Sequence, residues 1–178
     1  MSTIKVSTIS PLGTDATKTI TIGSASNGDV AAGVFTNTPS FLATLSSNQT
    51  ISNNTNTKIQ LDTVDYDTDS AFDNSTNYRF TVPSNKAGKY LFTFSHRTDL
   101  AIDTIYQMSI SLNGTTLKRS ESKNSKPNAT GSSSTVGSTI INMSVGDYVE
   151  LFMKQATGSA QLAYADYCSL SGMRLIGA

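Results

Sequence analysis

The sequence lacks most of the residues on which enzyme and metal sites are commonly built. It contains no tryptophan, one cysteine (Cys168), one histidine (His96) and two glutamates, Glu121 and Glu150. A single cysteine excludes a disulfide within the chain, and one histidine with one cysteine cannot complete a conventional zinc site. Any Ser-His-Asp or Cys-His mechanism would have to use His96. These scarcities predict a protein that is not an enzyme.

Charge is also scarce. Only 15% of the residues are charged, and the formal net charge is zero. Clustered Lys and Arg are needed for nucleic-acid binding and for a polybasic membrane patch, so neither partner is expected. No stretch is long and apolar enough to span a bilayer. Nothing after Met1 reads as a signal peptide, so we expect a soluble product made in a reducing cytoplasm without membrane insertion.

What the sequence does contain is a recurring strand pattern from Pro39 onward. Its polar residues are mainly Ser, Thr and Asn, of which Thr suits strands and the others suit turns. The clearest strand alternates over seven residues, and its apolar members are Tyr106, Met108, Ile110 and Leu112. Asn113-Gly114 then supplies a type I′ hairpin turn. Further strands are predicted at 90–94, 139–141, 148–153 and 168–176, and no helical period appears. The pattern predicts an all-β sandwich or barrel.

Two segments depart from this pattern. Residues 1–38 hold short β segments separated by Pro, Gly and polar residues, too little apolar material for a core of their own. We interpret them as an arm that becomes ordered on a partner or within an oligomer, with a disordered leader as the alternative. Residues 119–138 are polar and Ser-rich, with Pro127 and Gly131 among them, and are predicted to form a long exposed loop.

Three motifs follow one another within residues 39–178. The first runs from Phe72-Asp73 through Phe80-Thr81-Val82-Pro83 to Gly88-Lys89-Tyr90-Leu91-Phe92, the second is Gly146-Asp147 before a strand, and the third is Ser171-Gly172-Met173-Arg174-Leu175. Together they resemble the globular head of complement component one-q and the related tumour-necrosis-factor-like family. Two features depart from the family pattern: Leu170 replaces its usual aromatic residue, and Ser84 to Lys86 are inserted before Ala87.

The resemblance implies a ten-stranded jelly roll over residues 39–178 that associates as a tight homotrimer. Such trimers bury aromatic and aliphatic side chains along the threefold axis and present variable loops at one end. Our candidates for the core or the trimer interface are Tyr90, Phe92, Phe94, Tyr148, Phe152 and Tyr164. Aromatic residues at this spacing could also line a sugar site, but alternating strand positions favour the core or the interface.

Residues 1–38 carry a second resemblance. The segment from Ser2 to Pro11, with the later Thr19-Ile20-Thr21-Ile22-Gly23, is similar to the start of many bacteriophage virion proteins. It implies a virion location: a trimeric fibre, spike or capsid-decoration head, joined to other virion proteins through residues 1–38. The head would bind a host surface glycan or receptor, or stabilise the particle. The alternatives are a free cellular lectin-like or ligand-type trimer, and a polysaccharide-degrading spike.

The rest of the chain offers only weak candidates for catalytic or metal-binding residues. His96 is predicted to be a polar residue at a strand end, and Cys168 a small buried hydrophobic residue. Asp65, Asp67 and Asp69 have the spacing that opens a calcium loop, but Ser70 and Thr76 stand where that loop requires Gly and Glu. A solvated acidic turn is the alternative, and we expect no cofactor. No Gly-rich phosphate loop is present.

Overall fold

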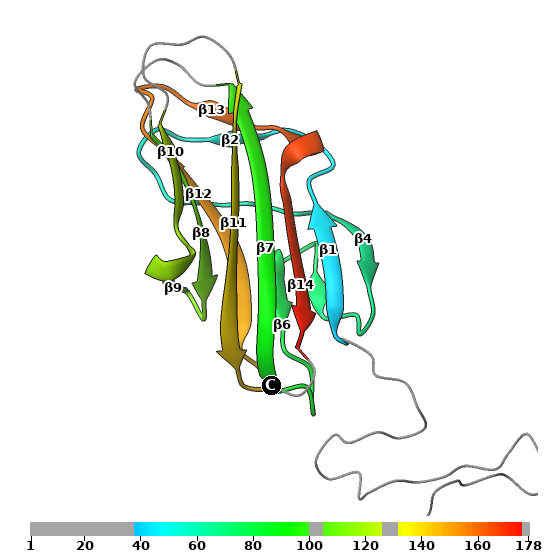
Figure 1. The fold of residues 1–178 in the computed structure, drawn as a ribbon. Coiled ribbons are helices and arrows are strands. Elements are labelled where there is room, and N and C mark those ends of the chain that lie inside the picture. The colour runs from blue at the N-terminus through cyan, green and yellow to red at the C-terminus, as the bar shows by residue number, and fades with distance from the viewer. Residues whose placement is uncertain (1–37, 100–104, 126–131, 176–178) are drawn as a thin grey trace, which may run out of the picture. The chain divides into compact units, whose positions relative to one another are not determined.

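Two antiparallel β-sheets pack face to face in the computed structural model, which describes residues 38–99, 105–125 and 132–175. The first sheet has five strands side by side in Figure 1. Their order is β11 (Ser132–Met143), β7 (Gly88–Asp99), β14 (Ser169–Arg174), β1 (Ser40–Thr44) and β4 (Thr63–Asp67). The first and last strands of the domain are therefore neighbours, since β1 pairs along its whole length with β14.

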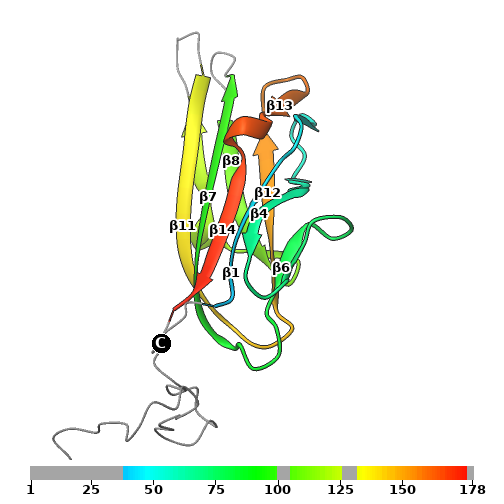
Figure 2. The ribbon, with the colours of Figure 1, turned by 90° about the vertical axis from the view of Figure 1, so that its right-hand side faces the viewer.

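The second sheet lies behind the first, as the rotated view in Figure 2 shows. Its order is β10 (Ser122–Ser125), β8 (Ile105–Leu112), β12 (Tyr148–Gln155), β6 (Arg79–Thr81) and β5 (Phe72–Asp73), with β3 (Thr57–Lys58) beside β12 and β9 (Thr115–Thr116) beside β8. A short ribbon of β2 (Gln49–Ile51) and β13 (Gln161–Ala163) lies at one end. The helical elements of the described chain are two 3₁₀ turns, η2 (Lys118–Ser120) and η3 (Ala165–Tyr167). The predicted all-β jelly roll is confirmed.

The core lies between the sheets and follows from the alternation of the strands. Tyr90, Phe92 and Phe94 point inward from β7 and are almost completely buried. The ring of Phe41 on β1 stacks on that of Phe80 on β6, with centroids 4.9 Å apart. The predicted strand from Tyr106 to Leu112 is β8, whose apolar side faces the same core. Aromatic side chains from both sheets therefore hold the layers together.

Two glycines let large rings lie against bare backbone. Gly172 on β14 is the cross-strand neighbour of both Phe41 and Phe92. A Cβ atom at Gly172 would lie 2.6 Å from the Phe41 ring and 2.7 Å from the Phe92 ring. Gly137 on β11 stands opposite Phe94 in the same way. Gly172 therefore allows two aromatic rings to approach the backbone of β14 closely.

The predicted hairpin turn is also present. Asn113 and Gly114 have φ values of +50° and +78°, as a type I′ turn requires, and they join β8 to β9. The Asn113 side chain donates to the Asp147 carboxylate over 2.8 Å and accepts from the Tyr148 N–H over 2.9 Å. The amide thereby ties this turn to the Gly-Asp turn of the second motif.

The prediction of a long loop at 119–138 is wrong for much of its length. Ser122–Ser125 form β10, and residues 132–138 begin the twelve-residue strand β11. Every residue of β11 has a partner on β7, which continues the five-stranded sheet. Serine has little strand preference of its own, so pairing with a long neighbour determined the outcome. Residues 126–131 lie outside the described residues, as does the predicted arm up to residue 37.

No helix in the part of the chain that the structure describes is long and apolar enough to cross a membrane.

Replacing Gly172 by alanine is expected to destabilise the domain by about 1–3 kcal/mol, because the new methyl group overlaps both rings. Chemical denaturation measures the change. In the double variant with Phe41→Leu, which removes one of the two rings, the cost of Gly172→Ala should fall. A Thr115→Ala variant at an exposed strand position is the control, with a change within about 0.5 kcal/mol. Equal costs for Gly172→Ala with and without Phe41 would contradict this account.

Candidate functional site

The outward side of the five-stranded sheet carries a group of apolar side chains, here called the outer face. Four of its members are exposed, namely Tyr66, Val136, Ile140 and Met173, and two are half-buried, Leu42 and Leu91. Val136 is 69% exposed and Ile140 is 54% exposed. Isolated exposed apolar residues are normal, but a contiguous group indicates an interaction surface.

The sheet register places these side chains next to one another. Leu91 on β7 pairs with Ile140 on β11 and with Met173 on β14, so the three form one row across the sheet. Leu42 on β1 pairs with Tyr66 on β4. Directly paired residues share a face. The apolar residues therefore come from five strands that are far apart in the sequence, and only the folded sheet assembles them.

Hydroxyl groups occupy the centre of the outer face, and they are paired with one another. The hydroxyls of Thr93 and Ser171 lie 2.6 Å apart, and those of Ser95 and Ser169 lie 2.7 Å apart. Ser95 also donates to the Tyr167 carbonyl. Burying a polar group is costly when it loses its partner. Because these hydroxyls bond to one another, another protein surface can cover them at little cost.

Charge distinguishes the outsides of the two sheets. On β11, β7, β14 and β1 the central outward positions of the outer face carry no charged residue, and Lys89 and Arg97 stand near its two ends. The Arg97 guanidinium lies 4.5 Å above the Tyr167 ring. The other sheet carries the ion pair Lys58–Glu150 at 2.6 Å on its outside. Depletion of charge at the centre is typical of interface cores, so the outer face is the better interface candidate.

The six predicted core or interface aromatics fall in three places. Tyr90, Phe92 and Phe94 are buried within the single chain, at 0–1% exposure. Tyr148 and Phe152 are partly exposed on the outside of the seven-stranded sheet, where Arg79 lies 4.0 Å above the Tyr148 ring. Tyr164 is half-buried and precedes η3. None of the six belongs to the outer face.

His96 lies on β7 and points into the core, with 1% of its surface exposed. Neither ring nitrogen has a hydrogen-bond partner among the described residues. Burial lowers the pKa of His96 to about 4, because a charged imidazolium loses its hydration there. The ring is therefore neutral near pH 7. It was predicted as a polar strand-end residue, and the structure instead buries it completely.

Cys168 lies between η3 and β14 and is buried, with 1% of its surface exposed, as the sequence predicted. Burial raises the pKa of its thiol to about 12. The thiolate is the nucleophilic form of cysteine, so this side chain is held in its unreactive form.

The acidic run is occupied by the protein's own donors. The Asp67 carboxylate accepts from the Phe72 N–H over 2.7 Å, and Asp69 pairs with Lys86 at 3.4 Å. Asp65 is exposed. Among the described residues no group of three or more His, Cys, Asp or Glu side chains is placed to hold a metal ion. Asp73 instead caps the following turn: N–H groups of Thr76 and Ser75 hold its pKa well below the usual range.

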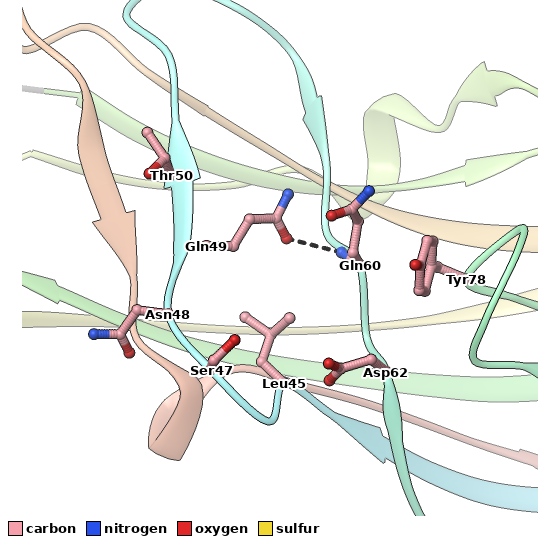
Figure 3. Close-up of a pocket in the computed structure, with 8 residues that line it drawn as sticks. All are labelled: Leu45, Ser47, Asn48, Gln49, Thr50, Gln60, Asp62 and Tyr78. Atoms are coloured by element: carbon pink, nitrogen blue, oxygen red, sulfur yellow. Dashed lines mark hydrogen bonds between the residues drawn. The ribbon is translucent and has the colours of Figure 1, made fainter.

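A small polar pocket lies where three connections meet beyond β1 (Figure 3). Its volume is about 280 Å³. Its lining comes from the segment after β1 with the start of β2, the segment between β3 and β4, and the turn before β6. The residues are Leu45, Ser47, Asn48, Gln49, Thr50, Gln60, Asp62 and Tyr78. These segments are separate in the sequence, so the eight residues come together only in the folded chain.

The family model of the C1q domain matches residues 40–175, which is most of the described chain. The chain belongs to the C1q family. No curated protein matches this C1q chain in sequence. Domains of this kind are commonly binding modules rather than enzymes, and they often form trimers.

Solved structures agree on the fold. The globular domain of zebrafish complement 1qA is 15% identical, covers 77% of this chain and 97% of its own, and has a TM-score of 0.55. Murine APRIL is 15% identical, with coverage of 76% and 98% and a TM-score of 0.57. Eiger TNF from S. frugiperda is 12% identical, with coverage of 78% and 92% and a TM-score of 0.53. At these identities the likeness establishes the jelly-roll fold alone.

Acid is expected to destabilise this C1q domain through His96. The unfolded histidine takes up a proton near pH 6.5, whereas the folded one does so only near pH 4. The free energy of unfolding is therefore not reduced by His96 above pH 6.5. It falls as the pH drops to 4, by up to about 3 kcal/mol. Urea denaturation at several pH values measures this loss.

The matched variants are His96→Gln and His96→Phe, which cannot take up the proton. Because His96 is the only histidine of the chain, both should flatten the stability curve between pH 6.5 and 4. A wild-type loss that both variants retain would show that other groups cause it.

Proposed function

We propose that this chain is a non-enzymatic, homotrimeric head of a bacteriophage virion protein. It acts as a fibre, spike or capsid-decoration protein, joined to the particle through residues 1–38. The end away from that junction binds the host surface or a neighbouring particle component. Its place of work is the virion, after synthesis in the host cytoplasm.

The outer face is the main observation that supports the proposed trimer. Its apolar residues surround a centre without charge, and its hydroxyls already bond to one another. Three copies meeting through this face would bury the apolar side chains of each without leaving a charge unpaired. The opposite side of the sandwich would stay outside the interface, with Lys58, Arg79 and the nearly buried Glu150 that pairs with Lys58.

The course of the chain supports a display role. β1 begins at Ser40 and β14 ends at Arg174, and the N–H of Arg174 donates to the carbonyl of Pro39 over 3.0 Å. The described chain therefore starts and finishes at one end, and the β2–β13 ribbon lies at the other (Figure 1). Three heads on one attachment would present three equal ends to a repeated surface. Linked sites bind such a surface with higher avidity than a single site.

The sequence of residues 1–38 supports the virion part of the proposal. The segment from Ser2 to Pro11 is similar to the arms that join fibre and capsid-fibre domains to phage particles. Residues 1–37 lie outside the described residues, so this support comes from the sequence alone.

A lysine among the apolar side chains of the outer face is expected to abolish the trimer. Val136→Lys would place three ammonium groups in the interface without partners, a large desolvation cost. Multi-angle light scattering of the full chain at micromolar concentration should give a trimer for the wild type and a monomer for the variant. The matched control is Val145→Lys, because Val145 is 52% exposed in a turn outside the outer face. A monomeric wild type, or a trimeric Val136→Lys variant, would contradict the proposal.

Deletion of residues 1–38 tests the virion part separately. Chains lacking this segment should no longer co-sediment with phage particles, because the proposed junction is gone, yet should remain trimeric in light scattering. The full chain carrying Val145→Lys is the control and should stay with the particles. If the shortened chain still co-sediments, the arm is not the attachment, and if the full chain never co-sediments, the protein acts free of a particle.

A further inference from the structure

The polar pocket beyond β1 shares no residue with the outer face, so trimer formation does not account for it. It begins directly after Thr44, at the end of β1 opposite to the Ser40 end where the described chain starts. In the proposed trimer the pocket would therefore lie toward the displayed end. This position is the one in which a binding site for an outside ligand would be useful.

Two sets of hydrogen bonds fix the shape of the pocket. The Gln49 side chain donates to the Lys58 carbonyl over 2.8 Å and accepts from the Gln60 N–H over 2.8 Å. The Asp62 carboxylate accepts from the Ser46 N–H over 2.7 Å and from its hydroxyl over 2.6 Å. These bonds join the segment after β1 to the segment between β3 and β4. A site held in shape before binding loses little entropy when a ligand arrives.

Other polar groups around the pocket remain available. The Ser47 hydroxyl, the Gln60 side-chain amide and the Tyr78 hydroxyl have no hydrogen-bond partner among the described residues. The Asp62 carboxylate has lone pairs beyond those that Ser46 uses. Figure 3 shows the Ser47, Gln49 and Asp62 side chains gathered around Leu45. The pocket thus offers donors and acceptors side by side, as a ligand with several hydroxyl groups requires.

Tyr78 adds an observation of a different kind. Its φ is +51°, in the left-handed region that a bulky residue rarely adopts. Such conformations have a cost and persist where the surrounding structure enforces them, often at binding sites. Here the conformation accompanies an aromatic ring at the wall of a polar pocket. The electron-rich face of an aromatic ring attracts weakly positive C–H groups, which line one side of many sugar rings.

We propose that this pocket is the binding site for a single neutral sugar residue at the end of a surface glycan. A volume of about 280 Å³ is near the lower limit for small-molecule sites and suits one ring rather than a chain. The Asp62 carboxylate stands in the lining and no cationic side chain does, so a sugar without an acidic group is favoured over an anionic one. The inference rests on the proposed function, because one weak site per chain becomes useful when three are displayed together.

The test measures binding of simple sugars to the full chain by NMR titration. The probes are the methyl glycosides of glucose, galactose, mannose, fucose and N-acetylglucosamine, with the methyl glycoside of N-acetylneuraminic acid as the anionic comparison. We expect at least one neutral glycoside to bind with a millimolar Kd and to shift the side-chain amide signal of Gln60. The anionic glycoside should bind at least tenfold more weakly.

Two variants locate the site. Gln60→Ala should weaken binding about fivefold, the effect of one lost hydrogen bond. Tyr78→Asn should weaken it at least as much, and asparagine tolerates the left-handed backbone, so the turn should keep its shape. Asn56→Ala, at an exposed position outside the pocket lining, is the matched control and should bind as the wild type does. Circular dichroism confirms that each variant is folded.

Failure of this inference and failure of the proposed function give different results. A trimer by light scattering that binds none of the neutral glycosides overturns the sugar site and leaves the trimeric head standing. Sugar binding that Gln60→Ala and Tyr78→Asn leave unchanged also overturns the site. A monomer that binds sugar in the pocket supports the site and contradicts the trimer.

Discussion

The packing of two phenylalanine rings over the bare backbone of Gly172 is the constraint on which this domain depends. Phe41 and Phe92 stand on the strands either side of β14, and both rings occupy the space that a side chain at Gly172 would fill. The contact fixes the register of β14 with β1 and with β7, so that inward-pointing residues of the three strands lie side by side. Because side chains alternate along a strand, it fixes the outward rows as well. The outer face is therefore a consequence of how the core is packed.

This link explains why the fold was more predictable than the site. The alternation of Tyr90, Phe92 and Phe94 and the Asn113-Gly114 turn are local patterns, and the structure contains both as predicted. The outer face depends instead on register between strands far apart in sequence. Val136 stands among serines, with Ile140 four positions later, and neither indicates an interface until β11 is paired with β7. The predicted loop at 119–138 concealed this strand, since serine favours turns when no neighbour is known.

The pocket was harder still to anticipate. Gln49, Gln60 and Asp62 are ordinary polar residues in the sequence, and their roles come from hydrogen bonds between separate connections. The left-handed conformation of Tyr78 has no sequence signal, because tyrosine seldom adopts it. His96 shows the same limit in reverse. A polar residue next to Arg97 reads as a strand end, yet strand alternation continues through it and turns the ring into the core.

The shared end of β1 and β14 has a mechanical consequence. If the domain is held where β1 starts, at Ser40, and is pulled from the end with the β2–β13 ribbon, β1 carries the load. That strand is hydrogen-bonded on both sides, to β14 and to β4, in antiparallel register. Tension along it would have to shear these bonds together rather than open them one at a time. Bonds loaded in this way resist sliding of the strand better than peeling of its end.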